Sequence, residues 1–521
     1  MMIRTLLLLI VFCLPLTVDA QVRLPQFFSD GMVLQRESEV RLWGWADAGQ
    51  ALTVTPSWDG KPYSTRADSQ GRFEVTLHTP EAGGPYEITI SPPQPPLGGE
   101  KGASLTLSHP PQGGPGGACL TLSHPSLRGE KGASLALCHP PQGGPGGAIL
   151  RNVLIGEVWL CSGQSNMEMQ MKGFKAQPVE GTTEELLNCN DAQLRLFTVK
   201  RHPSLTPADD VTGQWSEATS GSVRDFSATA YYFGRALRRQ LGVPVGLIST
   251  SFGGSACEAW MKGDWLRDFP QVQQTITAAD VQRLQQRCPT ALYNGQLAPL
   301  VGYALRGAIW YQGEDNVPRY QYYASLLARM VQGWREEWQQ GDFPFYYCQI
   351  APYEYSLIDW HGSQYLREQQ LKAETMIPNA RMACLLDAGL RYGIHPRKKR
   401  QAGERLALLA LAHTYHQKGL PDFATYASVE FRGDTAVVAF DRSKEWVYFE
   451  DGPTTGRNFE VAGADRVFHP AQAWVDRNRV YVRSSEVPKP VAVRYAFHDW
   501  VVGDLMHDGL PVSSFRTDNW E

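Results

Sequence analysis

Residues 156–167, GEVWLCSGQSNM, decide how this chain folds. Apolar residues run without a break from Val158 to Cys161, as they do in strands buried on both faces of a parallel sheet. Gly163 then permits a turn, and Ser165 stands at its tip. Sites in open α/β sheets lie at the carboxyl ends of strands, so this turn would place one hydroxyl beside free backbone N–H groups. That arrangement suits nucleophilic acyl transfer; the alternative is an ordinary turn in which serine caps a helix.

The stretch from about 150 to 420 alternates between strand-like and helix-like patterns. Apolar residues at helical spacing predict helices over 230–241 and 326–338, and apolar strands follow each of them at 245–248 and 345–350. A later strand at 382–386 leads to a helix that begins near Pro396. Such alternation predicts a mostly parallel sheet with helices on both faces, a three-layer α/β/α domain over 148–420.

The flanking regions have a different pattern. Apolar and polar residues alternate over 21–90 and again over 421–521, which predicts an N-terminal and a C-terminal β-sandwich-like domain. Between them, 91–147 is rich in Gly and Pro, and residues 99–118 recur almost unchanged at 129–148. This segment has little apolar area to bury, so we expect a duplicated, low-complexity, disordered insertion. A Pro-rich docking segment is the alternative.

Composition excludes several classes of protein. The 521 residues contain 49 Lys and Arg against 53 Asp and Glu, so no basic field would gather a nucleic acid. Hydrophobic residues make up 43% of the chain, which is enough for large cores. The cysteines are widely spaced and form no C-x-x-C pair, so a metal cluster is not expected.

The first twenty residues have the features of a signal peptide. Arg4 is followed by an apolar run at 6–12 and by the small residues of 18–20, where cleavage would leave Gln21 at the mature N-terminus. The apolar run is too short to span a membrane, and no later segment is long and apolar enough. We therefore expect a secreted or periplasmic protein without a membrane span.

A serine nucleophile needs a base, and His395 is the candidate. It lies in GIHP, 393–396, after the last predicted parallel strand, and Pro396 fits the first position of the next helix. Two other predicted strand ends carry polar loops, SFGGS at 251–255 and WYQGEDN at 310–316. Their small residues and amide groups could donate hydrogen bonds to an oxyanion.

The four blocks GEVWLCSGQSNMEM, LISTSFGGSACEAW, WYQGEDN and IHP, in this order, resemble the sialate O-acetylesterase branch of the SGNH (GDSL-type) hydrolases. The resemblance covers the chain after residue 20 except the 91–147 segment. It implies that Ser165 is the nucleophile and His395 the base. It also implies that the Ser165 N–H, Gly253 or Gly254 and the Gln312 side chain hold the oxyanion. The other polar residues of the WYQGEDN block would shape the sugar site: Glu314, Asp315 and Asn316.

The reaction implied by this resemblance removes an acetyl ester from a hydroxyl of sialic acid or a related glycan. It proceeds through an acetyl-enzyme and needs no metal or organic cofactor. One alternative is an esterase of acetyl xylan or another plant polysaccharide. A second is a carbohydrate-binding protein whose hydrolase domain is inactive. The sequence gives no indication of an oligomeric state.

One departure from the superfamily concerns the third member of the triad. Many SGNH hydrolases have an Asp two or three residues before the His, whereas this chain has Gly393 and Tyr392 there. Asp387 is the candidate replacement; otherwise a backbone carbonyl orients the imidazole of a Ser-His dyad. The basic run 397–400 follows directly. Such runs usually face solvent, but beside His395 we expect Arg397 and Lys398 to attract the carboxylate of an acidic sugar.

Overall fold

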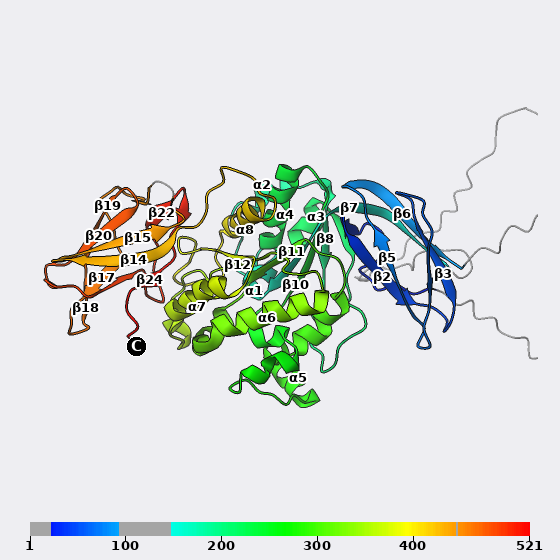
Figure 1. Ribbon diagram of the computed structural model, residues 1–521, viewed down its shortest axis with the longest axis horizontal. Coiled ribbons are helices and arrows are strands. Elements are labelled where there is room, and N and C mark those ends of the chain that lie inside the picture. Colours follow the sequence, from blue (N-terminus) through cyan, green and yellow to red (C-terminus); the bar gives the residue numbers. More distant parts are fainter. Residues whose placement is uncertain (1–21, 93–146, 444–445, 521) are drawn as a thin grey trace, which may run out of the picture.

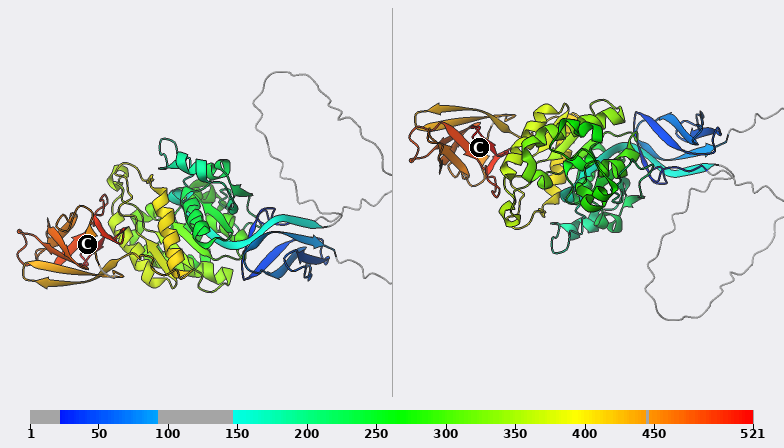
Figure 2. Two further views of the ribbon diagram at one scale, coloured as in Figure 1. Left: turned by 90° about the horizontal axis from the view of Figure 1, so that it is seen from above. Right: turned by 90° about the horizontal axis from the view of Figure 1, so that it is seen from below.

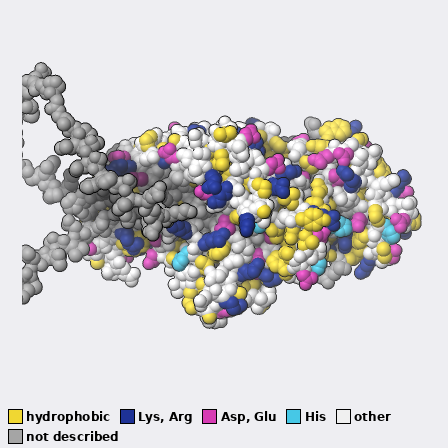
Figure 3. Space-filling view, turned by 180° about the vertical axis from the view of Figure 1, so that it is seen from behind, with side chains coloured by type: hydrophobic (Ala, Val, Ile, Leu, Met, Phe, Trp, Pro, Cys, Tyr) yellow, Lys and Arg dark blue, Asp and Glu magenta, His cyan; other side chains and the backbone are white. Residues whose placement is uncertain are grey.

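The computed structural model of the chain describes residues 22–92, 147–443 and 446–520. The expected signal peptide and nearly all of the expected insertion lie outside these residues. Figure 1 shows three units in a row, a β domain at each end and an α/β domain between them. None of the described helices is long and apolar enough to cross a membrane. On the face drawn in Figure 3, basic and acidic side chains both lie over the central domain.

The N-terminal domain is built from short strands, as the period-two pattern predicts. They are β1 (Val33–Gln35), β2 (Glu39–Trp45), β3 (Ala51–Pro56), β4 (Tyr63–Arg66), β5 (Arg72–His78) and β6 (Gly83–Ser91). β2 pairs with β5, whereas β3 pairs with β4 and β6, all antiparallel. Every second side chain of β5 is buried, because successive side chains of a strand point to opposite faces.

A single long strand, β7 (Ala148–Gly163), connects this domain to the next. Its first half pairs with β6 and β1, and its second half, from Glu157 to Gly163, pairs with the central sheet. The boundary expected at residue 148 therefore falls at the start of a strand that both domains share. This continuity fixes the N-terminal domain relative to the turn that carries Ser165.

The central sheet has the order β13-β12-β11-β7-β10-β8-β9 and is parallel except for its edge strand β9. Its other strands are β8 (Asp191–Thr198), β9 (Trp215–Ala218), β10 (Val245–Ser251), β11 (Gly307–Tyr311), β12 (Phe345–Cys348) and β13 (Ala380–Ala383). The helices are α1 (Ser165–Glu168), α2 (Thr182–Asn188), α3 (Ser220–Asp225), α4 (Ala228–Leu241), α5 (Ala278–Leu284), α6 (Tyr323–Trp338), α7 (Ser363–Met376) and α8 (Lys399–His413).

Alternate residues of β7 contribute to separate cores on the two faces of the sheet. Val158 and Leu160 belong to the core that includes residues of α6 and α7. Trp159 and Cys161 belong to the core that includes residues of α4 and α8, and α4 and α8 pack against each other (Figure 2). Helices therefore cover both faces, as predicted, and the fold is a three-layer α/β/α domain between β-rich flanks.

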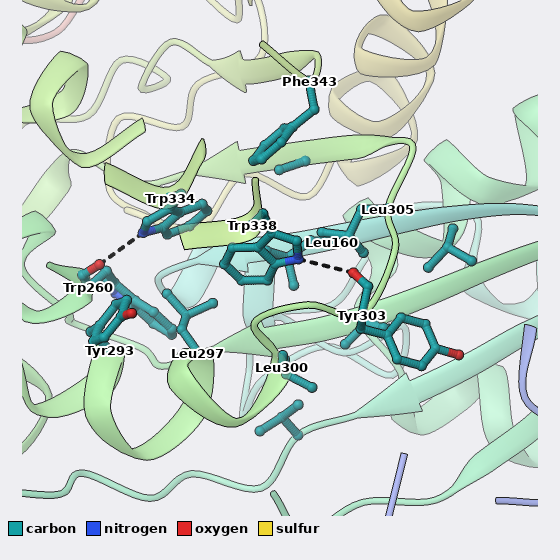
Figure 4. Packing of buried hydrophobic residues seen from close by; sticks show 14 of the residues in the cluster. Leu160, Trp260, Tyr293, Leu297, Leu300, Tyr303, Leu305, Trp334, Trp338 and Phe343 are labelled. Atoms are coloured by element: carbon teal, nitrogen blue, oxygen red, sulfur yellow. Dashed lines mark hydrogen bonds between the residues drawn. The ribbon is translucent and has the colours of Figure 1, made fainter. Parts of the chain in front are cut away.

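Indole groups hold α6 against the loops beneath the sheet (Figure 4). Trp334 Nε1–H donates to the Trp260 carbonyl and Trp338 Nε1–H to the Tyr303 carbonyl, both at 3.0 Å. A buried indole costs little when its N–H has such a partner. These pairs fix the loop after β10, which contains Trp260, on the helical layer.

The described residues of the C-terminal domain form no helix but a series of strands. They are β14 (Thr425–Arg432), β15 (Thr435–Asp441), β16 (Tyr448–Phe449), β17 (Phe459–Ala462), β18 (Phe468–Pro470), β19 (Gln472–Asp476), β20 (Arg479–Arg483), β21 (Ala492–Tyr495), β22 (Leu505–His507), β23 (Leu510–Pro511) and β24 (Phe515–Arg516). Polar contacts attach it to α7: Arg516 binds Glu368 through two hydrogen bonds at 2.7 and 2.9 Å, and the buried Arg367 donates to the His498 carbonyl.

Candidate active site

Ser165 is the first residue of α1, directly after β7. Gly163 has a φ of +141°, a conformation that favours glycine, and a Cβ there would lie 2.2 Å from the Tyr311 carbonyl oxygen. The Ser165 N–H lacks an intrahelical acceptor because it starts the helix. Within the described chain the Ser165 hydroxyl makes no hydrogen bond. The turn thus leaves one hydroxyl and one N–H available.

The loop after β10 lies against this turn. A Cβ on Gly253 would lie 3.3 Å from the Ser165 Cβ, so only glycine fits there without a shift. The Gly253 N–H donates to Glu168 Oε2 at 2.8 Å, and Arg201 binds the same carboxylate through two hydrogen bonds. The Gly254 N–H, by contrast, has no acceptor among the described residues. Of the two glycines, Gly254 keeps the N–H that is free to donate.

His395 lies on the loop between β13 and α8, partly buried. Its Nδ1 is 2.5 Å from Gln177 Oε1, and its ring meets Phe174 edge-on, with centroids 5.1 Å apart. An amide oxygen only accepts, so we place the proton on Nδ1 and the free lone pair on Nε2. Nε2 has no partner in the described part of the chain. The ring is therefore held in the tautomer that a general base requires.

Asn166 joins the serine turn to the histidine loop. Its Nδ2 donates to the Ile394 carbonyl at 3.1 Å, which connects the residue after Ser165 to the residue before His395. No hydrogen bond joins the Ser165 hydroxyl to the His395 ring within the described residues. Catalytic hydrogen bonds are often long or poorly aligned before substrate binds, so the missing bond does not exclude His395 as the base of Ser165.

The structure does not bring Asp387 to His395. Both carboxylate oxygens of Asp387 accept from Arg405, each at 2.7 Å. A bidentate guanidinium pair of this kind is strong and leaves the carboxylate facing α8. The neutral amide of Gln177 occupies the position on His395 Nδ1 for which the sequence offered Asp387 or a backbone carbonyl.

The WYQGEDN block also differs from expectation. Gln312 is fully buried, and its Nε2 donates to the Ser255 carbonyl and to Asn316 Oδ1 at 3.1 and 2.7 Å. Asn316, also fully buried, donates to Glu258 and accepts from the Cys257 N–H. In this structure these amides hold the loops after β10 and β11 together, and neither is free to meet an oxyanion or a sugar.

Lys399 and Glu314 form a buried polar group beneath the serine turn. α8 begins at Lys399, so the prediction that Pro396 occupies the first helical position is wrong. Lys399 is 1% exposed and donates to Asn166 Oδ1. Glu314 is 2% exposed and accepts from Asn166 Nδ2 at 2.5 Å, while its Oε2 has no partner in the described chain.

Burial shifts the titration of three ionisable groups around the serine turn: His395, Lys399 and Glu314. It lowers the pKa of His395 to about 4, an effect that the nearby positive charge of Lys399 reinforces. It also lowers the pKa of Lys399 to about 7, although Glu314 opposes that shift. The pKa of Glu314 is raised by burial, against the effects of Asn166 and Lys399. His395 is therefore neutral, and able to accept a proton, well below pH 7.

Sequence reasoning missed Gln177 and Lys399. Gln177 lies in an irregular loop, where no periodic pattern marks a side chain that points inward. Lys399 stands within four consecutive basic residues, a pattern that usually faces solvent. The one available signal was that positive charges at a helix start oppose the helix dipole, which indicates another use.

No group of three or more His, Cys, Asp or Glu side chains in the described residues is arranged to hold a metal ion. The cysteines at 161, 189, 257, 288, 348 and 384 are free and buried. What the site offers instead is a hydroxyl, an imidazole and two free backbone N–H groups at one edge of the sheet. Those are the parts of a serine hydrolase.

Comparisons with known proteins relate this chain to carbohydrate esterases. The profile of a family described as carbohydrate esterase, sialic acid-specific acetylesterase, matches residues 155–408. The sialate O-acetylesterase of Mus musculus is 26% identical over 76% of this chain and 74% of its own length. That of Homo sapiens is 31% identical over 52% of this chain and 56% of its own length.

A solved structure extends the likeness over nearly the whole chain. The crystal structure of a carbohydrate acetylesterase from Xanthomonas citri is 32% identical, with a TM-score of 0.79, over 96% of this chain and 100% of that one. The two β domains are thus included in the match. The chain belongs to the carbohydrate esterase family described as sialic acid-specific acetylesterase, and it is a carboxylic ester hydrolase.

Proposed function

We propose that this carbohydrate acetylesterase removes O-acetyl groups from sialic acids or related acidic glycans through an acetyl-enzyme on Ser165. The observation that carries the proposal is the Asn166–Ile394 contact, which holds the free Ser165 hydroxyl and the oriented His395 ring at one edge of the sheet. Bringing a nucleophile and its base into one geometry removes much of the entropic barrier to reaction.

In the first step Ser165 Oγ attacks the acetyl carbonyl carbon while His395 Nε2 takes the hydroxyl proton. The Ser165 and Gly254 N–H groups donate to the oxyanion that forms. His395 then gives the proton to the departing sugar oxygen, which leaves an acetyl ester on Ser165. Water, deprotonated by His395, attacks this ester, and release of acetate restores the serine.

Gln177 differs from the usual carboxylate in one respect. Its amide oxygen fixes the tautomer of His395 but carries no charge to stabilise the imidazolium that forms during each step. Burial, reinforced by the charge of Lys399, lowers the pKa of His395 to about 4, and no carboxylate of the described residues stands beside Nδ1 to oppose that shift. The site therefore supplies an oriented but weak base.

Two basic residues beside His395 support an acidic substrate. Arg397 and Lys398 are exposed, and neither side chain has a partner in the described chain. A sugar carboxylate could pair with them without displacing an existing ion pair. The sequence of residues 1–20 supports export, which would bring the enzyme to such glycans; N-terminal sequencing of the exported protein should begin at Gln21.

The test compares Ser165→Ala with the parent chain on p-nitrophenyl acetate, O-acetylated sialic acid and acetylated xylan. We expect the parent to release acetate fastest from the sialic acid, and Ser165→Ala to release none. Arg397→Ala with Lys398→Ala should slow the sialic ester and leave p-nitrophenyl acetate unchanged. Faster release from xylan would identify a plant-polysaccharide esterase, and no release by the parent an inactive carbohydrate-binding protein.

A further inference from the structure

A buried lysine that the proposed reaction does not use lies directly beneath the site. Lys399 is 1% exposed, and lysines are almost never buried to that degree unless they are paired. Removing an ammonium group from water is strongly unfavourable before its new contacts are counted. A functional role would explain why Lys399 is buried beside the candidate active site despite this unfavourable desolvation.

The contacts of Lys399 converge on a single amide. Lys399 Nζ donates to Asn166 Oδ1 and lies 5.4 Å from the centre of the Tyr311 ring. Asn166 Nδ2 in turn donates to Glu314 Oε1 at 2.5 Å and to the Ile394 carbonyl at 3.1 Å. Both ends of this amide are therefore used, and they join α8, the loop after β11 and the histidine loop.

Lysine decides which way the Asn166 amide points. The oxygen and nitrogen ends of an amide have nearly the same shape, so packing alone does not distinguish them. An ammonium group only donates and a carbonyl only accepts. Lys399 and Ile394 on opposite ends of the amide therefore exclude the flipped arrangement, in which both contacts would be lost.

We infer that Lys399 is a positioning residue that, through Asn166 and with Glu314 as its counter-charge, holds the Ser165 turn in register with the His395 loop. This rests on the proposed roles of Ser165 and His395. A misplacement of about 1 Å at such a site costs on the order of a hundredfold in rate.

The charge of Lys399 also acts on His395. The other groups packed around that ring, Gln177 and Phe174, are uncharged. Farther off, Asp387 is neutralised by Arg405, and Glu314 is the counter-charge of Lys399 itself. The other charged side chains of the two adjoining loops are exposed, where water screens them: Lys172, Lys175, Glu180, Arg391, Arg397 and Lys398. Together with burial, the larger cause, the positive charge of Lys399 opposes protonation of His395.

The first test measures turnover of p-nitrophenyl acetate by Lys399→Met, with Lys372→Met on the exposed surface of α7 as the matched control. We expect kcat to fall about ten- to a hundredfold with KM within about twofold, because positioning is lost and substrate contacts are not. The control should match the parent. Unchanged kcat in a folded Lys399→Met protein would overturn the inference.

The second test does not depend on turnover. In a Ser165→Ala background, NMR titration of His395, assigned with His395→Gln, should show a higher pKa when Lys399→Met is added. An unchanged pKa would overturn the charge coupling. Asn166→Ala, which keeps the charge, should lower kcat and leave that pKa near the parent value; full activity would overturn the positioning role. Failure of the proposed function has a different signature, undiminished turnover by Ser165→Ala.

Discussion

Two buried glutamates at opposite ends of the same sheet have opposite surroundings. Glu157 lies at the start of the part of β7 that pairs with the central sheet, next to the N-terminal domain. It is fully buried and accepts from Arg36, Arg306 and Tyr415 at 2.5, 2.6 and 3.0 Å. Glu314 follows β11 at the other end. It accepts from Asn166, and its Oε2 has no partner among the described residues.

The difference distinguishes a carboxylate that only stabilises the fold from one that belongs to the candidate active site. A buried carboxylate whose oxygens are paired fixes the elements around it, and here it joins the N-terminal domain to the sheet and to the segment after α8. One with an unpaired oxygen is destabilising where it stands. Proteins keep such unpaired groups where function requires them. Glu314 accepts from Asn166, which belongs to the Ser165 turn and also contacts the His395 loop.

The largest effect should come from Glu157→Gln. Arg36 and Arg306, each about one-quarter to one-third exposed, would lose their anionic partner. Breaking such a pair costs about 3 kcal/mol, so the urea midpoint should fall while kcat of the folded protein stays near the parent value. A large loss of kcat without loss of stability would contradict the structural assignment.

Glu314→Gln should instead lower kcat without lowering the stability of the protein at pH 7. The amide keeps an acceptor for Asn166 but removes the counter-charge of Lys399, so we expect kcat to fall about tenfold. Because the pKa of Glu314 is raised on folding, its ionisation costs stability as pH rises above the ordinary carboxyl value. The variant should therefore be at least as stable as the parent at pH 7, with a smaller difference at pH 4. Lower stability at pH 7 would show that the two glutamates do not differ as described.

Gln177→Glu would replace the neutral amide beside His395 Nδ1 with a carboxylate. The parent should keep its kcat/KM down to an apparent pKa of about 4, because only neutral His395 accepts the serine proton. A carboxylate at Nδ1 favours the imidazolium, so the acid limb should move to higher pH. The pH profile of p-nitrophenyl acetate hydrolysis measures this, and Gln177→Asn serves as the uncharged control. An acid limb that does not move would mean that residue 177 does not contact the base.

The sequence predicted the scaffold, and it singled out Ser165 and His395 without the residues that contact their loops. The apolar run of β7 and the glycine after it mark the turn of Ser165, and the position of His395 after a strand marks the opposing loop. Gln177 and Lys399 could not be found this way, because their inward direction depends on loop conformation rather than on periodicity. Asp387 was one of two candidates for orienting His395, and its bidentate pairing with Arg405, 18 residues later on α8, could not be read from periodicity either.

The smallest effect should come from removing residues 93–146. Ile90 of β6 pairs directly with Ala148 of β7, so the two strands are adjacent where this segment leaves and returns. A short Asn-Gly turn can join antiparallel neighbours of this kind. We expect the shortened chain to keep its melting temperature and kcat within experimental error. Loss of soluble protein would show that the segment is needed for folding.

The most direct test of the account is the identification of the acetylated residue during turnover. Acid quenching of the enzyme with O-acetylated sialic acid, followed by peptide mass spectrometry, should find one acetyl group on Ser165. Gln177→Ala, with its base no longer oriented, should reach that state more slowly than the parent. Turnover with the acetyl group on another residue, or with none on Ser165 at any quench time, would contradict the account.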